Sequence, residues 1–283
     1  MRRALTLLLS AGLLAVATGC GARDALELDP VADAASKTTD AGSSRVAFEV
    51  TTTAAGEKIT LAGAGIFAYD EARGSMTMDT SSLVPGAGGT IEMRMLGTMM
   101  YLRLPDSLSG QLPQGKKWLG LDLGKSFDAA GLGRLTPGQL QQDPAQMLRL
   151  LRASSTSVRE AGNATVRGTD TRHYTAMLDL DKALTVTADE LGLSEQQRKE
   201  MRAAAQHLKK QSGVDRIPVH VFVDDEGLLR RMSMTMTSTV EGENLSLEVL
   251  TDYFDFGVEV GVKAPPAAQV FDLTKSLEAF TQG

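Results

Sequence analysis

The chain has a single cysteine, Cys20, in 283 residues, so no disulfide can form within it. Aromatic side chains are scarce, at 5% of the residues with one tryptophan, which leaves few groups to stack on sugar rings. There are three histidines, and no nucleophile, zinc or phosphate-loop motif is present. We therefore expect no enzyme, no catalytic residue, no metal site and no cofactor.

Excess positive charge is missing as well. The formal charge is −6, and the only concentration of Lys and Arg lies on the exposed-looking segment 198–210. This balance argues against nucleic acid as a partner, because such proteins gather basic side chains against phosphates.

A hydrophobic run long enough to span a membrane is also lacking at the start of the chain. Arg2 and Arg3 precede Ala4–Thr18, which is shorter than the roughly 20 residues that a spanning helix needs. The run ends in Ala17-Thr18-Gly19-Cys20, where small residues precede the only cysteine, as in a lipobox. We expect residues 1–19 to be a signal peptide and Cys20 to carry a lipid anchor at the extracytoplasmic face of the cell membrane. Whether export uses the Sec or the twin-arginine route stays open.

Residues 20–42 change in composition, with many Ala, Asp, Ser and Thr and no aromatic residue. Few apolar groups are available there to offset chain entropy, which predicts a disordered tether with a reach of roughly 25–30 Å. Residues 43–283 are long enough to form one domain with a sizeable core.

Most of that domain alternates apolar and polar residues, which is typical of half-buried strands. The predicted strands are Arg45–Thr53, Lys58–Tyr69, Ser75–Ser81, Thr90–Leu96, Thr98–Leu104, Lys117–Leu123, Thr165–Asp170, Arg172–Leu180, Ile217–Val223, Leu228–Val240 and Asn244–Phe256. One polar face per strand implies an antiparallel sheet buried on one side. Gly63 and Gly65 leave gaps in the apolar pattern that suit a bend or the close approach of a ligand.

Helix signals interrupt the strands. Asp143-Pro144 begins one helix, and the capping box Ser194-Glu195-Gln196-Gln197 begins another that ends at Ser212, before Gly213. Asp181–Leu191 is a weaker helix. The fold class is therefore α+β: a large curved antiparallel sheet, or half-barrel, with a few helices packed on its concave apolar face.

The chain has thirteen methionines, and nine lie on three predicted strand segments. Methionine is not a preferred strand residue, but its flexible thioether suits a surface that accepts varied apolar shapes. The candidate lining of a lipid cavity is Val46, Phe48, Leu61, Phe67, Met76, Met78, Ile91, Met93, Met95, Met232, Met234 and Met236. Ordinary core packing explains the same pattern, so both interpretations stay open.

The histidines and one cluster of acidic residues are not interpreted as metal or catalytic sites. His173, His207 and His220 lack ligand spacing and are interpreted as surface or hydrogen-bonded side chains. Asp224, Asp225 and Glu226 precede Gly227 in a hairpin turn, where adjacent acids are usually solvated.

Several segments resemble the actinobacterial LppX/LprG/LprA/LprF type of lipoprotein, which is similar in fold to LolA. They are Met100-Tyr101-Leu102-Arg103, Lys117-Trp118-Leu119-Gly120-Leu121-Asp122-Leu123, the hairpin from Val221 to Arg231, and Val262-Lys263-Ala264-Pro265-Pro266. The resemblance implies a half-barrel around helices whose cavity holds the acyl chains of lipids or glycolipids. The alternative is an envelope sensor, regulator or interaction lipoprotein with a filled core and no ligand, whose membrane-protein partner the sequence does not name.

Overall fold

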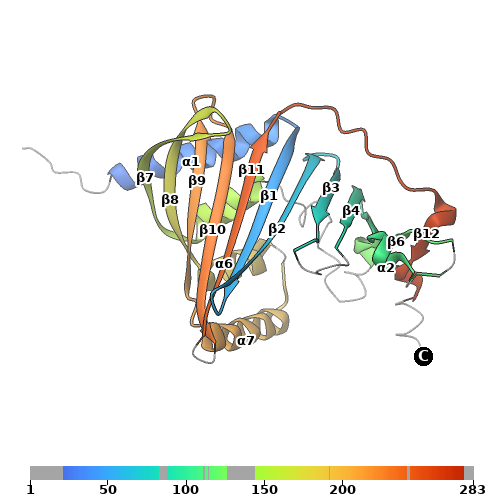
Figure 1. Ribbon diagram of the computed structural model, residues 1–283. Coiled ribbons are helices and arrows are strands. Elements are labelled where there is room, and N and C mark those ends of the chain that lie inside the picture. The colour runs from blue at the N-terminus through green and yellow to red at the C-terminus, as the bar shows by residue number, and fades with distance from the viewer. Residues whose placement is uncertain are drawn as a thin grey trace, which may run out of the picture.

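The computed structural model describes residues 22–82, 88–110, 112–113, 115–125, 144–190, 192–240 and 243–276. The predicted signal peptide and Cys20 lie outside these ranges. The described chain forms one large sheet with helices on its inner side (Figure 1).

The sheet contains twelve strands in the order β12-β6-β5-β4-β3-β2-β1-β11-β10-β9-β8-β7. Their bounds are β1 Ser43–Ala54, β2 Glu57–Ala68, β3 Arg73–Asp79, β4 Thr90–Leu96, β5 Met99–Arg103, β6 Trp118–Asp122, β7 Ser155–Val166, β8 Thr169–Asp179, β9 Arg216–Asp224, β10 Leu229–Val240, β11 Glu243–Phe254 and β12 Val270–Asp272. Neighbouring strands are antiparallel except β12 and β6, which are parallel. The α+β class with a large, mostly antiparallel sheet is thus confirmed.

The strand prediction is wrong at β7 and β8. The hairpin turns at Arg167 and Gly168, which both have positive φ angles of 49° and 83°, and not near Thr171 as the sequence pattern suggested. β7 also begins at Ser155, well before the predicted strand. A register shift next to Gly162 breaks the alternation of β7, so a search for period two does not find it.

The helices are α1 Ala22–Asp40, α2 Asp106–Ser109, α5 Pro144–Ser154, α6 Leu180–Glu190 and α7 Glu195–Ser212. The capping box of α7 is formed: the Gln197 N–H donates to Ser194 Oγ at 3.3 Å, and the Ser194 N–H donates to Gln197 Oε1 at 3.0 Å. Gly213 ends the helix in the left-handed conformation, at a φ of 70°.

The structure corrects the expectation of a disordered tether, because α1 is helical over residues 22–40. Its buried face has the i, i+3, i+4, i+7 spacing of an amphipathic helix and consists of Val31, Ala34, Ala35 and Thr38. Thr38 Oγ1 accepts a hydrogen bond from the Leu229 N–H at 2.9 Å, which fastens the helix to the start of β10. Composition missed this helix because its buried side chains are small, and tertiary packing stabilises it.

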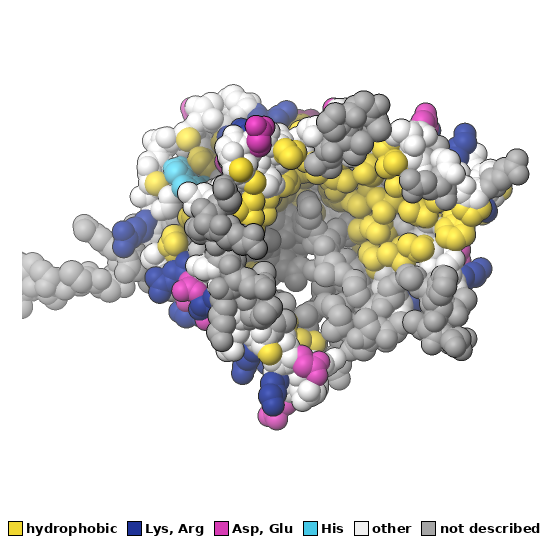
Figure 2. Space-filling view, turned by 60° about the horizontal axis from the view of Figure 1, so that its bottom comes forward, with side chains coloured by type: hydrophobic (Ala, Val, Ile, Leu, Met, Phe, Trp, Pro, Cys, Tyr) yellow, Lys and Arg dark blue, Asp and Glu magenta, His cyan; other side chains and the backbone are white. Residues whose placement is uncertain are grey.

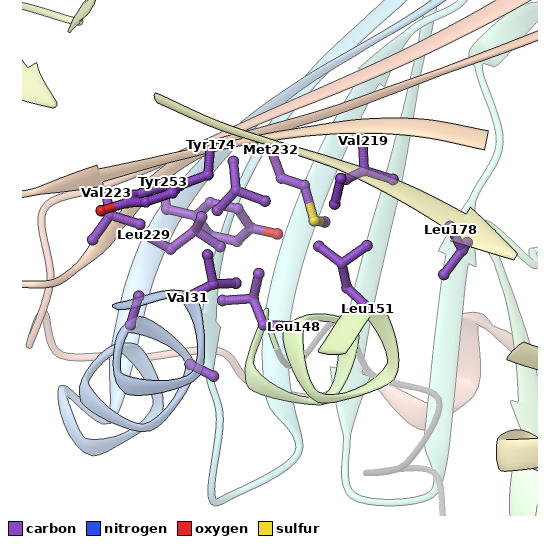
Figure 3. Packing of buried hydrophobic residues seen from close by; sticks show 14 of the residues in the cluster. Val31, Leu148, Leu151, Tyr174, Leu178, Val219, Val223, Leu229, Met232 and Tyr253 are labelled. Carbon is purple, nitrogen blue, oxygen red and sulfur yellow. The ribbon is translucent and has the colours of Figure 1, made fainter. Parts of the chain in front are cut away.

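The core lies between the sheet and the helices α1, α5 and α6. Figure 3 shows Val31 of α1 and Leu148 and Leu151 of α5 pointing toward the sheet, where Tyr174 and Met232 face them. Leu148 is 0% exposed and Leu151 is 2% exposed, so this part of the interior is filled by protein.

Candidate functional site

The register of the sheet brings the candidate lining residues to one face. Val46 on β1 lies opposite Gly65 on β2, and Gly65 lies opposite Met76 on β3. Met76 in turn lies opposite Met93 on β4. Since directly opposed residues of antiparallel strands point to the same side, these positions share the inner face.

The same face continues on the other side of β1. Val50 lies opposite Val249 on β11, and Val249 lies opposite Met234 on β10. Because side chains two residues apart share a face, all twelve candidates point to the inner side of the sheet.

Burial of these residues changes along the strands in one direction. On β10, Met232 is 7% exposed, whereas Met234 and Met236 are only partly buried. On β3, Met76 is buried and Met78 is partly buried. We name the buried candidates Val46, Phe67, Met76, Met95 and Met232 the closed wall. We name the partly buried candidates Phe48, Leu61, Met78, Ile91, Met93, Met234 and Met236 the open wall.

The open wall lies toward the end of the sheet where α7 is found. Figure 2, in which this end comes forward, shows hydrophobic side chains along the wall of a hollow. Ile59 lies two residues before Leu61 on the same face of β2 and is 45% exposed, a high value for a large apolar side chain. In the part of the chain that the structure describes, α1, α5 and α6 pack against β7–β10. In the described ranges, the inner face therefore has a part that is packed against helices and a part whose apolar side chains stay partly exposed.

The gaps expected at Gly63 and Gly65 are filled by protein. The ring of Phe48 lies where a Cβ of Gly63 would stand, and the ring of Phe67 lies 3.1 Å from the position of a Cβ on Gly65. The same Phe67 ring covers Gly74 on β3. These glycines accommodate aromatic rings of the protein itself, which corrects the expectation of a bend or a close approach by a ligand.

Further strands extend the inner face beyond the candidates. Leu102 on β5 lies opposite Met93, and Leu119 on β6 lies opposite Leu102. Both are partly buried. Sequence reasoning left out Leu102 because β5 is apolar on both faces, so its alternation did not say which side was inner.

Polar side chains on the outer face are mostly paired. Arg231 donates from Nε and Nη2 to both carboxylate oxygens of Asp252, at 2.5 and 2.9 Å. Arg94 pairs with Glu92 at 2.7 Å and lies over the ring of Trp118, 4.5 Å from its centroid. These contacts stabilise the convex side of the sheet, whereas the candidate apolar side chains lie on the concave side.

His173 and His220 meet on neighbouring strands. Their Nε2 and Nδ1 atoms are 2.9 Å apart, and the ring of Phe222 stacks on His173 with centroids 4.4 Å apart. Burial, and then the charge of His220, lower the pKa of His173 below its ordinary value of 6.5. The two histidines are thus hydrogen-bonded to one another.

Asp224 departs from the interpretation of a solvated acidic turn. It is buried, its Oδ1 accepts the Leu228 N–H at 2.8 Å, and its Oδ2 accepts from Arg230 Nε at 2.5 Å. Asp224 therefore closes the hairpin, while Asp225 and Glu226 are exposed. Among the described residues, no three His, Cys, Asp or Glu side chains are close enough together to hold a metal.

Two further findings concern the membrane. None of the helices in the described ranges is long and apolar enough to cross a bilayer. Cys20, the predicted site of lipid attachment, lies outside the described residues, so its modification stays a prediction.

The fold defines the class: an α+β half-barrel with helices against its concave face. The chain is similar to LprF from Mycobacterium bovis, at 12% identity and a TM-score of 0.45, over 86% of this chain and 98% of that one. It is similar to LppX from Mycobacterium tuberculosis, at 12% identity and a TM-score of 0.46, over 85% and 100% of the two chains. A LolA superfamily protein, NE2245 from Nitrosomonas europaea, aligns at 12% identity and a TM-score of 0.29, over 86% and 94%.

No protein-family model matches the chain, and no curated protein matches it. The similarities to solved structures concern the fold over most of the chain, at low identity. No functional residue is transferred from them.

Proposed function

We propose that this protein is a lipid-anchored, extracytoplasmic protein that binds lipids or glycolipids by their acyl chains. The observation that carries the proposal is the open wall: apolar side chains from five strands share one face and stay partly exposed beside a hollow (Figure 2). Monomeric proteins seldom leave a large contiguous apolar patch open, and such patches commonly mark a binding site.

The energetics of acyl burial fit such a wall. Removing one methylene from water contributes ~0.8 kcal/mol, so ten buried acyl carbons would contribute roughly 8 kcal/mol before the costs of binding. Methionine side chains adapt to different apolar shapes, so the wall should tolerate chains of different length and branching. Contacts to the head group would then adjust specificity.

The test compares two substitutions on one strand. Met234→Lys places a charge on the open wall, and Met232→Lys places the same charge two residues away on the closed wall. We expect Met234→Lys to stay folded and lose uptake of a pyrene-labelled diacylglycerol, and Met232→Lys to unfold the domain, because a buried charge has no partner there. Met78→Lys repeats the open-wall test on β3.

Two outcomes would count against the proposal. A folded Met234→Lys variant with normal uptake would remove Met234 from the wall, and the same result for Met78→Lys would exclude the wall as a whole. A wild-type chain that takes up no diacylglycerol, and that carries no lipid when mass spectrometry is applied after purification, would favour the interaction or sensor protein.

A further inference from the structure

Helix α7 crosses the end of the half-barrel at which the open wall lies (Figure 1). It contacts α6 and the β10 strand that carries Met234 and Met236. The helix has five Lys and Arg residues and two Glu residues, in a chain whose net charge is −6. Basic side chains therefore outnumber acidic ones on a helix next to the apolar wall, although the chain as a whole is acidic.

A cleft of about 610 Å³ lies between α6 and α7. Its apolar surface includes Leu184, and Lys209 lies on its polar side. The Lys209 Nζ is 3.1 Å from Asp181 Oδ2 and 2.8 Å from Asp215 Oδ1, so its charge is already compensated by the protein.

Arg202 differs from Lys209 in having no such partner within the described ranges. Arg202 and Gln206 line the cleft and also a second groove of about 600 Å³ along α7, where Lys199 and Glu195 lie. All three side chains are exposed, and none of them forms a hydrogen bond or ion pair with another described residue. Neighbouring Arg198 is instead paired with Asp189. Lys199 and Arg202, which have no partner in the described part of the chain, thus lie together with Gln206, since residues three and four apart share a helix face.

We propose that Arg202, with Lys199 and Gln206, binds the phosphate of a phospholipid head group. An arginine fork presents paired N–H donors that match two phosphate oxygens, and Lys199 adds a second cation one turn away. A lipid whose acyl chains lie on the open wall would leave its head group at this end of the sheet. The inference rests on the proposed function and names its substrate class: lipids with a phosphate next to the glycerol.

The experiment titrates the full-length chain with two lipids that differ only in the head group. Dioctanoyl phosphatidylglycerol carries the phosphate, and dioctanoylglycerol has the same chains without it. We expect wild type to bind the phosphatidylglycerol about tenfold more tightly, as measured by calorimetry. Arg202→Gln should remove that preference and leave the affinity for dioctanoylglycerol unchanged, whereas Arg159→Gln on exposed β7 should keep it.

Each other outcome overturns the assignment in a distinct way. Equal binding of the two lipids by wild type, or an unchanged preference in Arg202→Gln, excludes the phosphate site while the acyl proposal stands. Binding of sn-glycerol 3-phosphate as tight as that of the phosphatidylglycerol would make the ligand a water-soluble phosphate. If Arg202→Gln bound dioctanoyl phosphatidylglycerol normally and lost only its binding to phosphatidylglycerol vesicles, Arg202 would instead contact a bilayer surface. If neither lipid binds, both proposals fail.

Discussion

The ring of Phe48 on β1 occupies the space above Gly63 on β2, at the position where the Cβ of any other residue would stand. The pair explains why a glycine lies in the middle of an apolar strand face. On the same strand, exposure rises from Phe67, which is buried, through Leu61 to Ile59.

Gly63→Ala should therefore destabilise the domain by about 1–3 kcal/mol, as overpacking of a core does. The added Cβ would overlap the Phe48 ring and lie 2.5 Å from the Thr77 carbonyl oxygen. Gly110→Ala is the matched control, because it has open space around its Cβ. Equal urea midpoints for the two variants would show that the ring moves aside at no cost.

Helix α1 should behave as part of the core. Ala34→Glu buries a charge on its packed face and should cost about 3 kcal/mol or more, whereas Ser36→Glu on the exposed face should change stability by less than about 0.5 kcal/mol. Chemical denaturation measures both. Similar stability of the two variants would mean that the segment acts as a loose tether after all.

The pair formed by Arg231 and Asp252 should be important for stability. Asp252→Asn leaves two arginines near an uncharged group, because Arg167 also lies 3.6 Å from Asp252, and we expect a loss of about 2–4 kcal/mol. Asp255→Asn breaks an exposed pair with Arg45 at 3.5 Å and should cost less than about 0.5 kcal/mol. A thermal melt of each variant checks the difference.

The protein should become less stable as the pH is lowered, because His173 takes up a proton. Its pKa is lower in the folded protein than the ordinary 6.5, so the unfolded chain binds a proton more readily. The contribution of His173 is complete above pH 6.5 and is lost as the pH falls from there through the lower pKa of the folded state. His173→Gln should flatten the dependence of the unfolding free energy in this window, and His220→Gln should flatten it partly. Urea titrations at a series of pH values give the slopes.

Cys20→Ser should release the protein from the membrane or leave an uncut precursor, because a hydroxyl does not accept the lipid in place of the thiol. Fractionation of cells and mass spectrometry of the N-terminus distinguish the two results. Correct cleavage with full membrane retention would contradict the lipid anchor.

Local sequence patterns predicted much of this fold. The predicted bounds of β4 agree with the structure, and the capping box of α7 forms as its residues require. Alternation also placed all twelve candidate residues on one face, because period two is a local property of strands. A local pattern therefore sufficed wherever a single element decided the outcome.

What the sequence did not reveal depends on contacts between distant segments. α1 has few large apolar residues and is held by its packing on α5 and β9–β10. The division between closed and open walls runs along each strand and depends on what packs over each end, and alternation alone cannot distinguish Met232 from Met234, which lie on the same face. Likewise, the pairing of Phe48 with Gly63 needs the register of two strands, which the sequence pattern alone did not supply.

The pairing of β1 with β11 has a consequence for how the chain acquires its structure. Arg45 lies opposite Phe254, so the strand that is synthesised first joins one of the last, in the middle of the sheet. If the chain is exported, as we propose, it emerges from its N-terminus, and β1 must wait for almost the whole chain before this partner arrives. Such distant pairing slows folding and leaves strand edges uncovered in the meantime. Productive maturation of this protein should therefore depend on chaperones outside the cytoplasm, or on an interval in which the emerging chain is kept from aggregating.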